Sequence, residues 1–260
     1  AHTNANKTLT ASSQNGGLGY LPYVVPDGQY LVGDNGKLNP SATLGNRVYN
    51  NGQVYTIMPD DWIEEAYRNA LRQEYNLSIN GGGTNGTFYA SLGYLNADGI
   101  AVGSDYERYT ARMKATYQAT KWLNIGGNVS FARSTTNNGA DVSDTEDSGN
   151  NNIYTQIMLM GPIYPVYLRD ENGNILYNEN GIVGDYGDGQ LLGSNYVRPY
   201  LTQVNGIADA SMNTNKWGIT NFSLNGFADI DIWDGLTATL NASICSLHED
   251  YTANQQPFYR

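Results

Sequence analysis

The sequence is poor in charged residues, phenylalanine and cysteine, and each shortage narrows the class of protein. Of 260 residues, 15% are charged and five are phenylalanine, whereas 30 are glycine and 21 are tyrosine. This balance, with little leucine-rich helical material, favours an all-β protein. The single cysteine, Cys245, excludes an internal disulfide, and we interpret it as a small buried residue rather than a reactive thiol.

Long apolar runs and basic patches are also missing. No apolar run approaches the length of a membrane helix. The net charge of −11 would repel a nucleic-acid backbone, so we expect no nucleic-acid partner. The first residues do not form a signal peptide. Because neither end has a terminal signature, we expect both ends to be internal to a longer protein, with any export signal upstream.

Motifs for catalysis and for cofactor binding are absent as well. The two histidines, His2 and His248, lie at opposite ends of the chain. Neither a G-x-S-x-G nucleophile motif nor a phosphate-binding loop occurs, and the glycines at 81–83 indicate only a turn. We therefore expect no enzyme, no cofactor and no catalytic residue.

Two acidic segments offer the oxygen ligands that calcium prefers, but without EF-hand spacing. One contains Asp141, Asp144, Glu146 and Asp147, and the other spans residues 185–189. We interpret both as solvated loops and expect no metal site.

Alternation of apolar and polar residues is the main positive signal. Along residues 106–118, tyrosine, alanine and methionine share one face, while arginine, lysine, threonine and glutamine share the other. This period of two is typical of a β-strand. The same pattern occurs over residues 74–80, 88–94, 123–132, 221–232 and 236–245, with Phe227 as an apolar exception on a polar face. The sequence predicts an antiparallel meander of long hairpins.

The predicted strands are long enough to cross a membrane. They run for roughly 10 residues or more, whereas strands of soluble sheets are nearer five or six. Trp122 and Trp233 lie at tight turns, while Tyr94 and Tyr109 lie at the opposite strand ends. Two such aromatic levels resemble the girdles of a transmembrane barrel. We therefore predict that the fold is part of a large transmembrane β-barrel with long extracellular loops.

Charged residues in mid-strand indicate which face meets water. Facing lipid at mid-membrane, Arg112 or Lys114 would cost about 2–4 kcal/mol, so both are predicted to face the bore. The candidates for lining the lumen are Arg108, Arg112, Lys114, Asn128 and Asn225. The alternative for these residues is a solvated polar wall without a specific contact.

Short and long connections alternate, as in bacterial barrels with short periplasmic turns and long outer loops. We expect an extracellular loop over residues 13–72, with a short helix from Asp60 to Leu71. Four barrel strands then fill residues 73–134, a long extracellular loop fills 135–217, and two more strands fill 218–250. A further strand is expected around residues 7–12.

Tyrosines of the predicted outer loops are candidates for contact with substrate or partner. The main four are Tyr164, Tyr167, Tyr186 and Tyr196, and Tyr20, Tyr23 and Tyr30 are of the same kind. Their rings have apolar faces that stack on sugar rings. The alternative is that they pack loops against each other or against a lid protein.

An ordered series of short motifs covers roughly residues 55–250. It comprises Asp61-Trp62, the strand sequences at 75–82 and 88–95, Asp98-Gly99-Ile100, the sequences at 106–109 and 120–123, and Gly161-Pro162-Ile163-Tyr164-Pro165-Val166-Tyr167. Taken together, these motifs resemble the SusC/RagA family of TonB-dependent outer-membrane transporters. None of these motifs is catalytic.

The resemblance implies a barrel of roughly 22 strands in the bacterial outer membrane, closed by a plug that couples to TonB. It also implies a SusD-like lipoprotein partner, contact with outer-membrane lipid, and glycan or peptide substrates. The chain departs from the family by omission, because it contains no plug, no TonB box and only six to eight strands. The expected function is therefore that of one segment of a nutrient transporter.

Two other classes remain open from the sequence. An outer-surface barrel adhesin or glycan-binding protein would use the loops without transport. A soluble β-sandwich would bury the apolar strand face, including Leu123, Ile125, Leu224 and Leu240, against a second layer.

Overall fold

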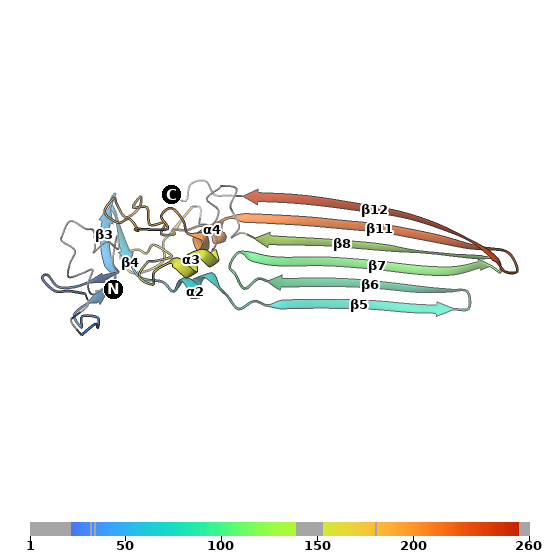
Figure 1. The fold of residues 1–260 in the computed structure, drawn as a ribbon, viewed down its shortest axis with the longest axis horizontal. Coiled ribbons are helices and arrows are strands. Elements are labelled where there is room, and N and C mark those ends of the chain that lie inside the picture. Colours follow the sequence, from blue (N-terminus) through green and yellow to red (C-terminus); the bar gives the residue numbers. More distant parts are fainter. Residues whose placement is uncertain (1–21, 32, 34, 139–152, 180, 255–260) are drawn as a thin grey trace.

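The computed structural model describes residues 22–31, 33, 35–138, 153–179 and 181–254, in which a long sheet extends from a compact head (Figure 1). The sheet consists of β5 (Arg72–Gly83), β6 (Gly86–Asp98), β7 (Ser104–Thr120), β8 (Leu123–Asn138), β11 (Thr214–Trp233) and β12 (Leu236–Asn254). Its order is β12-β11-β8-β7-β6-β5, with antiparallel neighbours throughout. The antiparallel meander is thereby confirmed, as an open sheet rather than a closed barrel.

Three two-residue turns close the hairpins at the end of the sheet that is far from the head (Figure 1). They are Thr84-Asn85, Lys121-Trp122 and Asp234-Gly235. Gly235 has φ 88°, a left-handed conformation that glycine adopts without steric cost. Irregular registers precede the latter two turns, between residues 118 and 120 and between 231 and 233.

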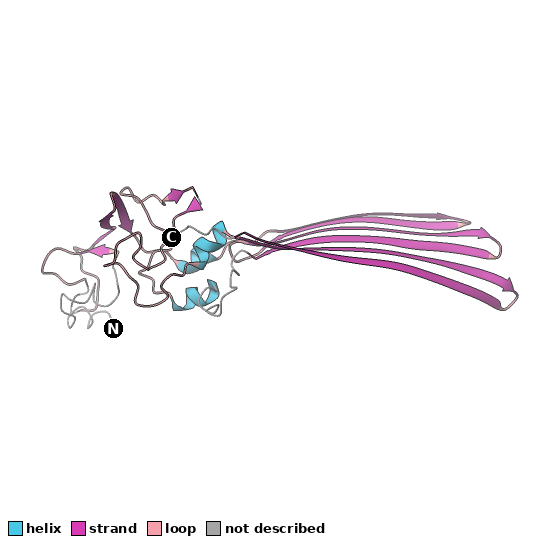
Figure 2. Cartoon of the chain, turned by 90° about the horizontal axis from the view of Figure 1, so that it is seen from above, coloured by secondary structure: helices cyan, strands magenta, loops and turns pink. Residues whose placement is uncertain are grey.

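The sheet is a single curved layer, and none of the helices in the described part of the chain covers either face (Figure 2). Ile125, Leu224 and Leu240 are 40%, 39% and 65% exposed, so the apolar face is not sandwiched against a second layer. Cys245, which pairs with Ser223 on the other side of the sheet, is exposed as well, and the prediction that it is buried was wrong. A strand residue is buried only when another layer covers it, and none of the described segments covers this part of the sheet.

The head contains the remaining elements and the hydrophobic core. Its strands are β1 (Tyr23–Val24), β2 (Thr43–Leu44), β3 (Asn46–Asn50), β4 (Gln53–Ile57), β9 (Tyr177–Asn178) and β10 (Gly181–Ile182), and its helices are α2 (Trp62–Ala66), α3 (Ile153–Leu159) and α4 (Gly206–Met212). None of the described helices is long and apolar enough to span a bilayer. The core gathers side chains from β3, β4, all three helices and the segment 160–168.

Helix α2 is shorter than the predicted Asp60–Leu71 helix. Asp61 caps it, accepting hydrogen bonds from the backbone N–H groups of Ile63 and Glu64. The helix ends because Tyr67 leaves in an extended conformation and forms a β-bridge with Ala101. A tertiary contact therefore overrides the local helical signal.

The predicted irregular loop at 13–60 contains a hairpin, β3–β4, that the sequence did not lead us to expect. Asn51 and Gly52 form its turn with φ 49° and 81°, the pair of left-handed residues that a type I′ turn requires. The Asn-Gly pair was the available signal. In the second long loop, α4 was not foreseen, and a bridge between Arg169 and Ile175 closes a tight turn at 170–174. The strand expected at 7–12 lies outside the described residues.

Candidate functional surfaces

The two faces of the sheet have opposite chemistry because directly paired residues on neighbouring strands share a face. One paired row runs through Leu77, Leu92, Ala111, Phe131, Phe222 and Ser246. The next runs through Ile79, Ala90, Met113, Val129, Leu224 and Ile244. We call this side the apolar face. Side chains such as Leu77 (72% exposed) and Met113 (64%) lie uncovered on it.

Aromatic residues mark both ends of the apolar face, at the strand ends where the sequence predicts membrane-interface aromatics. Trp122 lies in the β7–β8 turn, and Trp233 pairs with Leu236 next to the β11–β12 turn. At the head end, Tyr94 pairs with Tyr109, and their ring centroids are 5.0 Å apart. The head end is therefore edged with tyrosine and the turn end with tryptophan.

The opposite side, which we call the polar face, holds all five predicted lumen residues. Arg108, Arg112 and Lys114 alternate along β7. Asn128 pairs with both Lys114 and Asn225, so a cation and two amides lie in one row across three strands. The sequence thus placed these side chains on a common face, and the structure brings them side by side.

Hydrogen bonds between side chains cross the strands of the polar face. Asn225 Nδ2 donates to Asn128 Oδ1 (2.9 Å), and the hydroxyls of Ser130 and Ser223 are 2.6 Å apart. Near the turns, Thr239 Oγ1 donates to Asp229 Oδ1 at 2.8 Å. The polar face is therefore a wettable surface, with the cations Arg112 and Lys114 at mid-sheet and carboxylates at both ends, such as Asp229 near the turns and Glu74 near the head.

Phe227, the apolar exception on the polar face, lies over a glycine. It pairs with Gly126, where an added Cβ would approach the Phe227 ring to 2.5 Å. The glycine thus makes room for the aromatic ring, which explains why the alternation breaks there.

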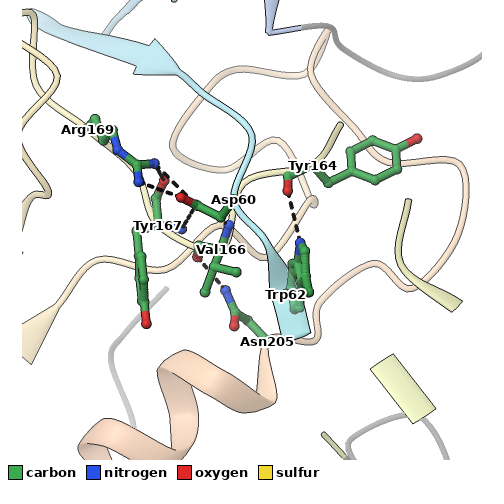
Figure 3. Close-up of polar contacts among 7 residues, drawn as sticks. All are labelled: Asp60, Trp62, Tyr164, Val166, Tyr167, Arg169 and Asn205. Atoms are coloured by element: carbon green, nitrogen blue, oxygen red, sulfur yellow. Dashed lines mark hydrogen bonds and ion pairs between the residues drawn. The ribbon is translucent and has the colours of Figure 1, made fainter. Parts of the chain in front are cut away.

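A buried ion pair joins the head segments that precede α2 and follow α3. Asp60 binds Arg169 through two contacts, Arg169 Nη2 to Oδ1 at 2.5 Å and Nη1 to Oδ2 at 3.2 Å (Figure 3). The backbone N–H groups of Val166 and Tyr167 donate to the same Asp60 Oδ2, at 2.7 and 3.2 Å. One carboxylate therefore fixes a segment more than 100 positions away in the sequence.

Neighbouring contacts complete this junction. Trp62 Nε1 donates to the Tyr164 carbonyl at 2.9 Å, and Asn205 Nδ2 donates to the Val166 carbonyl at 2.7 Å (Figure 3). Arg198, only 1% exposed, lies 5.9 Å from the centre of the Trp62 ring. The motifs that contain Asp61-Trp62 and residues 161–167 therefore meet in space and hold the head together.

Most of the tyrosines predicted to contact a substrate are buried in the head. Tyr164, Tyr167 and Tyr186 are 1%, 8% and 4% exposed, and Tyr196 packs half-buried against the core. Burial raises the pKa of Tyr164 to about 12 and raises that of Tyr167 further. These positions favour the alternative, that the rings pack loops against each other.

Other tyrosines present their rings at the surface of the head, and the sequence did not single them out. Tyr49 is 74% exposed, Tyr177 69% and Tyr154 63%. No sequence signal separates these exposed tyrosines from the buried ones, because all lie in the two segments that the sequence predicts as long outer loops. Of the remaining candidates, Tyr30 is exposed (53%), and Tyr20 lies outside the described residues.

The acidic segment at 185–189 uses its carboxylates within its own loop. Asp185 Oδ1 accepts from Gly187 N, and Asp188 Oδ1 accepts from Gln190 N, both at 3.1 Å. In the part of the chain that the structure describes, no three or more His, Cys, Asp or Glu residues form a group that could hold a metal ion. The other acidic segment, residues 141–147, lies outside the described residues.

Sequence comparison relates the chain to TonB-dependent receptors. No protein-family model matches it. TonB-dependent receptor P3 of Formosa agariphila is 26% identical over 124 residues, which are 48% of this chain and 12% of that receptor. TonB-dependent receptor SusC of Bacteroides thetaiotaomicron is 39% identical over 51 residues, 20% of this chain and 5% of SusC. The chain thus spans a small part of the curated relatives that it matches.

Structural comparison shows the same relationship at the level of the fold. The RagAB peptide importer in its open-open state superposes with a TM-score of 0.54 at 21% identity, covering 82% of this chain and 20% of that chain. A second RagAB structure, of the peptide transporter, gives a TM-score of 0.53 at 20% identity, covering 76% of this chain and 20% of that chain. The resemblance to SusC- and RagA-type proteins is confirmed, with the fold of a barrel segment.

Proposed function

We propose that this chain forms part of the barrel wall of a bacterial outer-membrane TonB-dependent transporter that imports glycans or oligopeptides. The observation that carries the proposal is one sheet with two uncovered faces of opposite polarity. Exposed leucine, isoleucine and methionine side chains in water would oppose folding, whereas contact with hydrocarbon stabilises them. The polar face is then free to meet a water-filled bore.

The dimensions of the apolar face fit a bilayer. Between Tyr109 and Thr120, β7 spans about 11 residues, or roughly 36 Å at about 3.3 Å per residue. At a tilt of about 40°, this length crosses roughly 28 Å, close to the apolar band of about 25 Å in outer-membrane barrels. The tyrosine and tryptophan levels would then lie at the two interfaces.

The head and the polar face have separate roles in this proposal. The head lies outside the cell, because long connections of bacterial barrels are extracellular and short turns periplasmic. There it contacts substrate and a SusD-like lipoprotein lid through exposed rings such as Tyr49, Tyr154 and Tyr177. In the bore, Arg112 and Lys114 face the carboxylates of a plug domain, through which TonB supplies energy.

Spin labels on adjacent residues of one strand test the orientation of the wall. In the intact protein in its membrane, Cys245 is first replaced by serine, and single cysteines are then introduced as Met113→Cys or Lys114→Cys. A nitroxide at 113 is expected to collide mainly with oxygen dissolved in lipid, and one at 114 mainly with a water-soluble nickel chelate. Leu224→Cys and Asn225→Cys form a second, matched pair on β11.

The test compares oxygen and nickel accessibility between adjacent positions of a strand and does not depend on any single position. Alternation between oxygen and nickel accessibility on both strands supports the barrel wall. Equal accessibility of adjacent positions to the nickel chelate would show that neither face meets lipid and would refute the proposal.

A further inference from the structure

We propose that the lipid-facing wall carries a binding site for a membrane lipid with an anionic phosphate headgroup, centred on Arg133. This inference rests on the proposed function, because it requires that the apolar face meet lipid. It adds a ligand class and a residue that transport itself does not assign. The physical basis is the place that the strand register gives to this arginine.

Arg133 lies on the apolar face, at the level of the tyrosines. The paired row at this level runs from Tyr75 through Tyr94 and Tyr109 to Arg133. Directly paired residues share a face, and Arg133 also shares the face of Phe131, two residues away on β8. An arginine therefore stands where the first three strands each place a tyrosine.

Arg133 has no partner among the residues that the structure describes. Its side chain is exposed, and it takes part in none of the hydrogen bonds or ion pairs found there. Glu107, one row nearer the head on the same face, accepts hydrogen bonds from Tyr94 (3.1 Å) and Tyr109 (2.7 Å) instead. The guanidinium is thus available to an anion from outside the chain.

The depth of Arg133 determines which anion it meets. Arginine on the lipid face costs about 2–4 kcal/mol at mid-membrane but only about 0–1 near the interface. About ten residues of β8 separate Arg133 from the turn end at Leu123, roughly 33 Å of strand. Arg133 therefore lies at the interface opposite the turns, where lipid phosphates are found and where a cation is attracted to anionic headgroups.

A groove whose lining includes Tyr109, the strand partner of Arg133, supplies a place for an acyl chain. It has a volume of about 700 Å³, and its lining is mainly apolar or aromatic, including Tyr75, Leu77, Leu92, Tyr94 and Phe131, with Glu74, Asn76 and Thr110 as its polar members. The guanidinium and the groove together match a molecule with a phosphate at one end and hydrocarbon at the other. Free phosphate would use only the guanidinium, so a lipid is the occupant that accounts for both features.

Lipid retention by the full protein tests the site. The purified protein in neutral detergent is titrated with phosphatidic acid or with diacylglycerol of the same acyl chains, and bound lipid is counted by native mass spectrometry. Wild-type protein is expected to retain phosphatidic acid in preference to diacylglycerol. Arg133→Gln should weaken phosphatidic acid binding roughly fivefold, the effect of one cation near an anionic headgroup. Arg133→Lys should keep most of the binding.

Lys114→Gln is the matched control, because it removes one exposed cation from the neighbouring strand on the polar face. It should leave lipid binding unchanged, and circular dichroism should show that each variant folds. Unchanged binding in Arg133→Gln, or an equal loss in Lys114→Gln, would overturn the proposal. Complete competition by inorganic phosphate would also overturn it, since the site would then recognise a free anion.

The two proposals fail in different ways. If the spin labels show no lipid-facing side, both fall. If the labels alternate as expected but Arg133→Gln retains as much phosphatidic acid as the wild-type protein, only the proposal of the lipid site is refuted.

Discussion

Removal of the Asp60 carboxylate should loosen the head without disturbing the sheet. In Asp60→Ala, Arg169 loses its ion-pair partner, and two backbone N–H groups, those of Val166 and Tyr167, lose their acceptor. The side chains of Asp60 and Arg169 are only 5% and 13% exposed, so water replaces the lost contacts poorly. The head should therefore open locally far more often.

The expected magnitude follows from the burial of the pair. Removing one partner of a buried ion pair costs about 3–5 kcal/mol. The lower end applies here because Arg169 retains some contact with solvent. A loss of about 3 kcal/mol corresponds to roughly a hundredfold faster exchange of amides that exchange through local opening.

Hydrogen exchange followed by mass spectrometry measures this change peptide by peptide. Peptides that cover residues 160–170 should exchange roughly a hundredfold faster in Asp60→Ala, whereas peptides from β7 and β8 should be unaffected. Asp61→Ala is the matched control, since it removes an adjacent but exposed carboxylate whose helix cap is worth about 1 kcal/mol. Asp60→Asn should be intermediate, because an amide oxygen still accepts the two N–H groups.

A comparison of these variants can refute the reasoning. If Asp60→Ala and Asp61→Ala accelerate exchange at 160–170 equally, the ion pair does not hold the segment. A double variant with Arg169→Met then completes a mutant cycle, in which a coupling energy near zero would also show that the pair contributes nothing.

Three further outcomes are expected. Met113→Arg should lower the unfolding free energy in a bilayer by about 2–4 kcal/mol, because it puts a charge on the lipid-facing side. Thr116→Arg, on the polar face, should not lower it. Denaturant titration measures both variants, and equal losses would contradict a lipid-facing side. Trp62→Phe should destabilise the head by about 1–3 kcal/mol by orphaning the Tyr164 carbonyl, seen as faster amide exchange there, and unchanged exchange would exclude that role. Hydrogen bonds to the Asp170 carboxylate lower its pKa, and the largest contribution comes from the backbone N–H of Asn174. The ionised carboxylate therefore stabilises the turn fully above the ordinary pKa of aspartate, and this stabilisation is lost as the pH falls through the lowered pKa. Amide exchange at 172–174, corrected for intrinsic rates, should show this acid loss in wild-type protein but not in Asp170→Asn.

The junction in the head also gives a physical meaning to two separated motifs. Asp61-Trp62 and the segment 161–167 belong to the series of motifs that resembles the SusC/RagA family, and neither is catalytic. Trp62 donates to Tyr164, and Asp60 binds Val166 and Tyr167. These hydrogen bonds hold the two long loops in one orientation relative to each other.

The sequence by itself determined the long alternating strands and the residues on each face. It assigned the glycines at 81–83 to a turn, which was wrong, because they pair with β6 as the end of β5 and the turn is Thr84-Asn85. A period of two is a local property, since neighbouring side chains of any strand point to opposite sides. Arg112, Lys114 and Asn128 could therefore be assigned to one face from their positions alone. The sequence also indicated the cap of α2, because a carboxylate before a helix accepts its first N–H groups.

Only the tertiary structure decided which tyrosines are buried, what Asp60 binds and whether a second layer covers the sheet. Burial of Tyr164 depends on segments that lie far apart in the chain, and no local pattern records such distant contacts. The same holds for Tyr67, where a bridge to Ala101 ends a helix that local signals would have extended. Local periodicity fixes the direction of a side chain, whereas long-range packing decides what it meets.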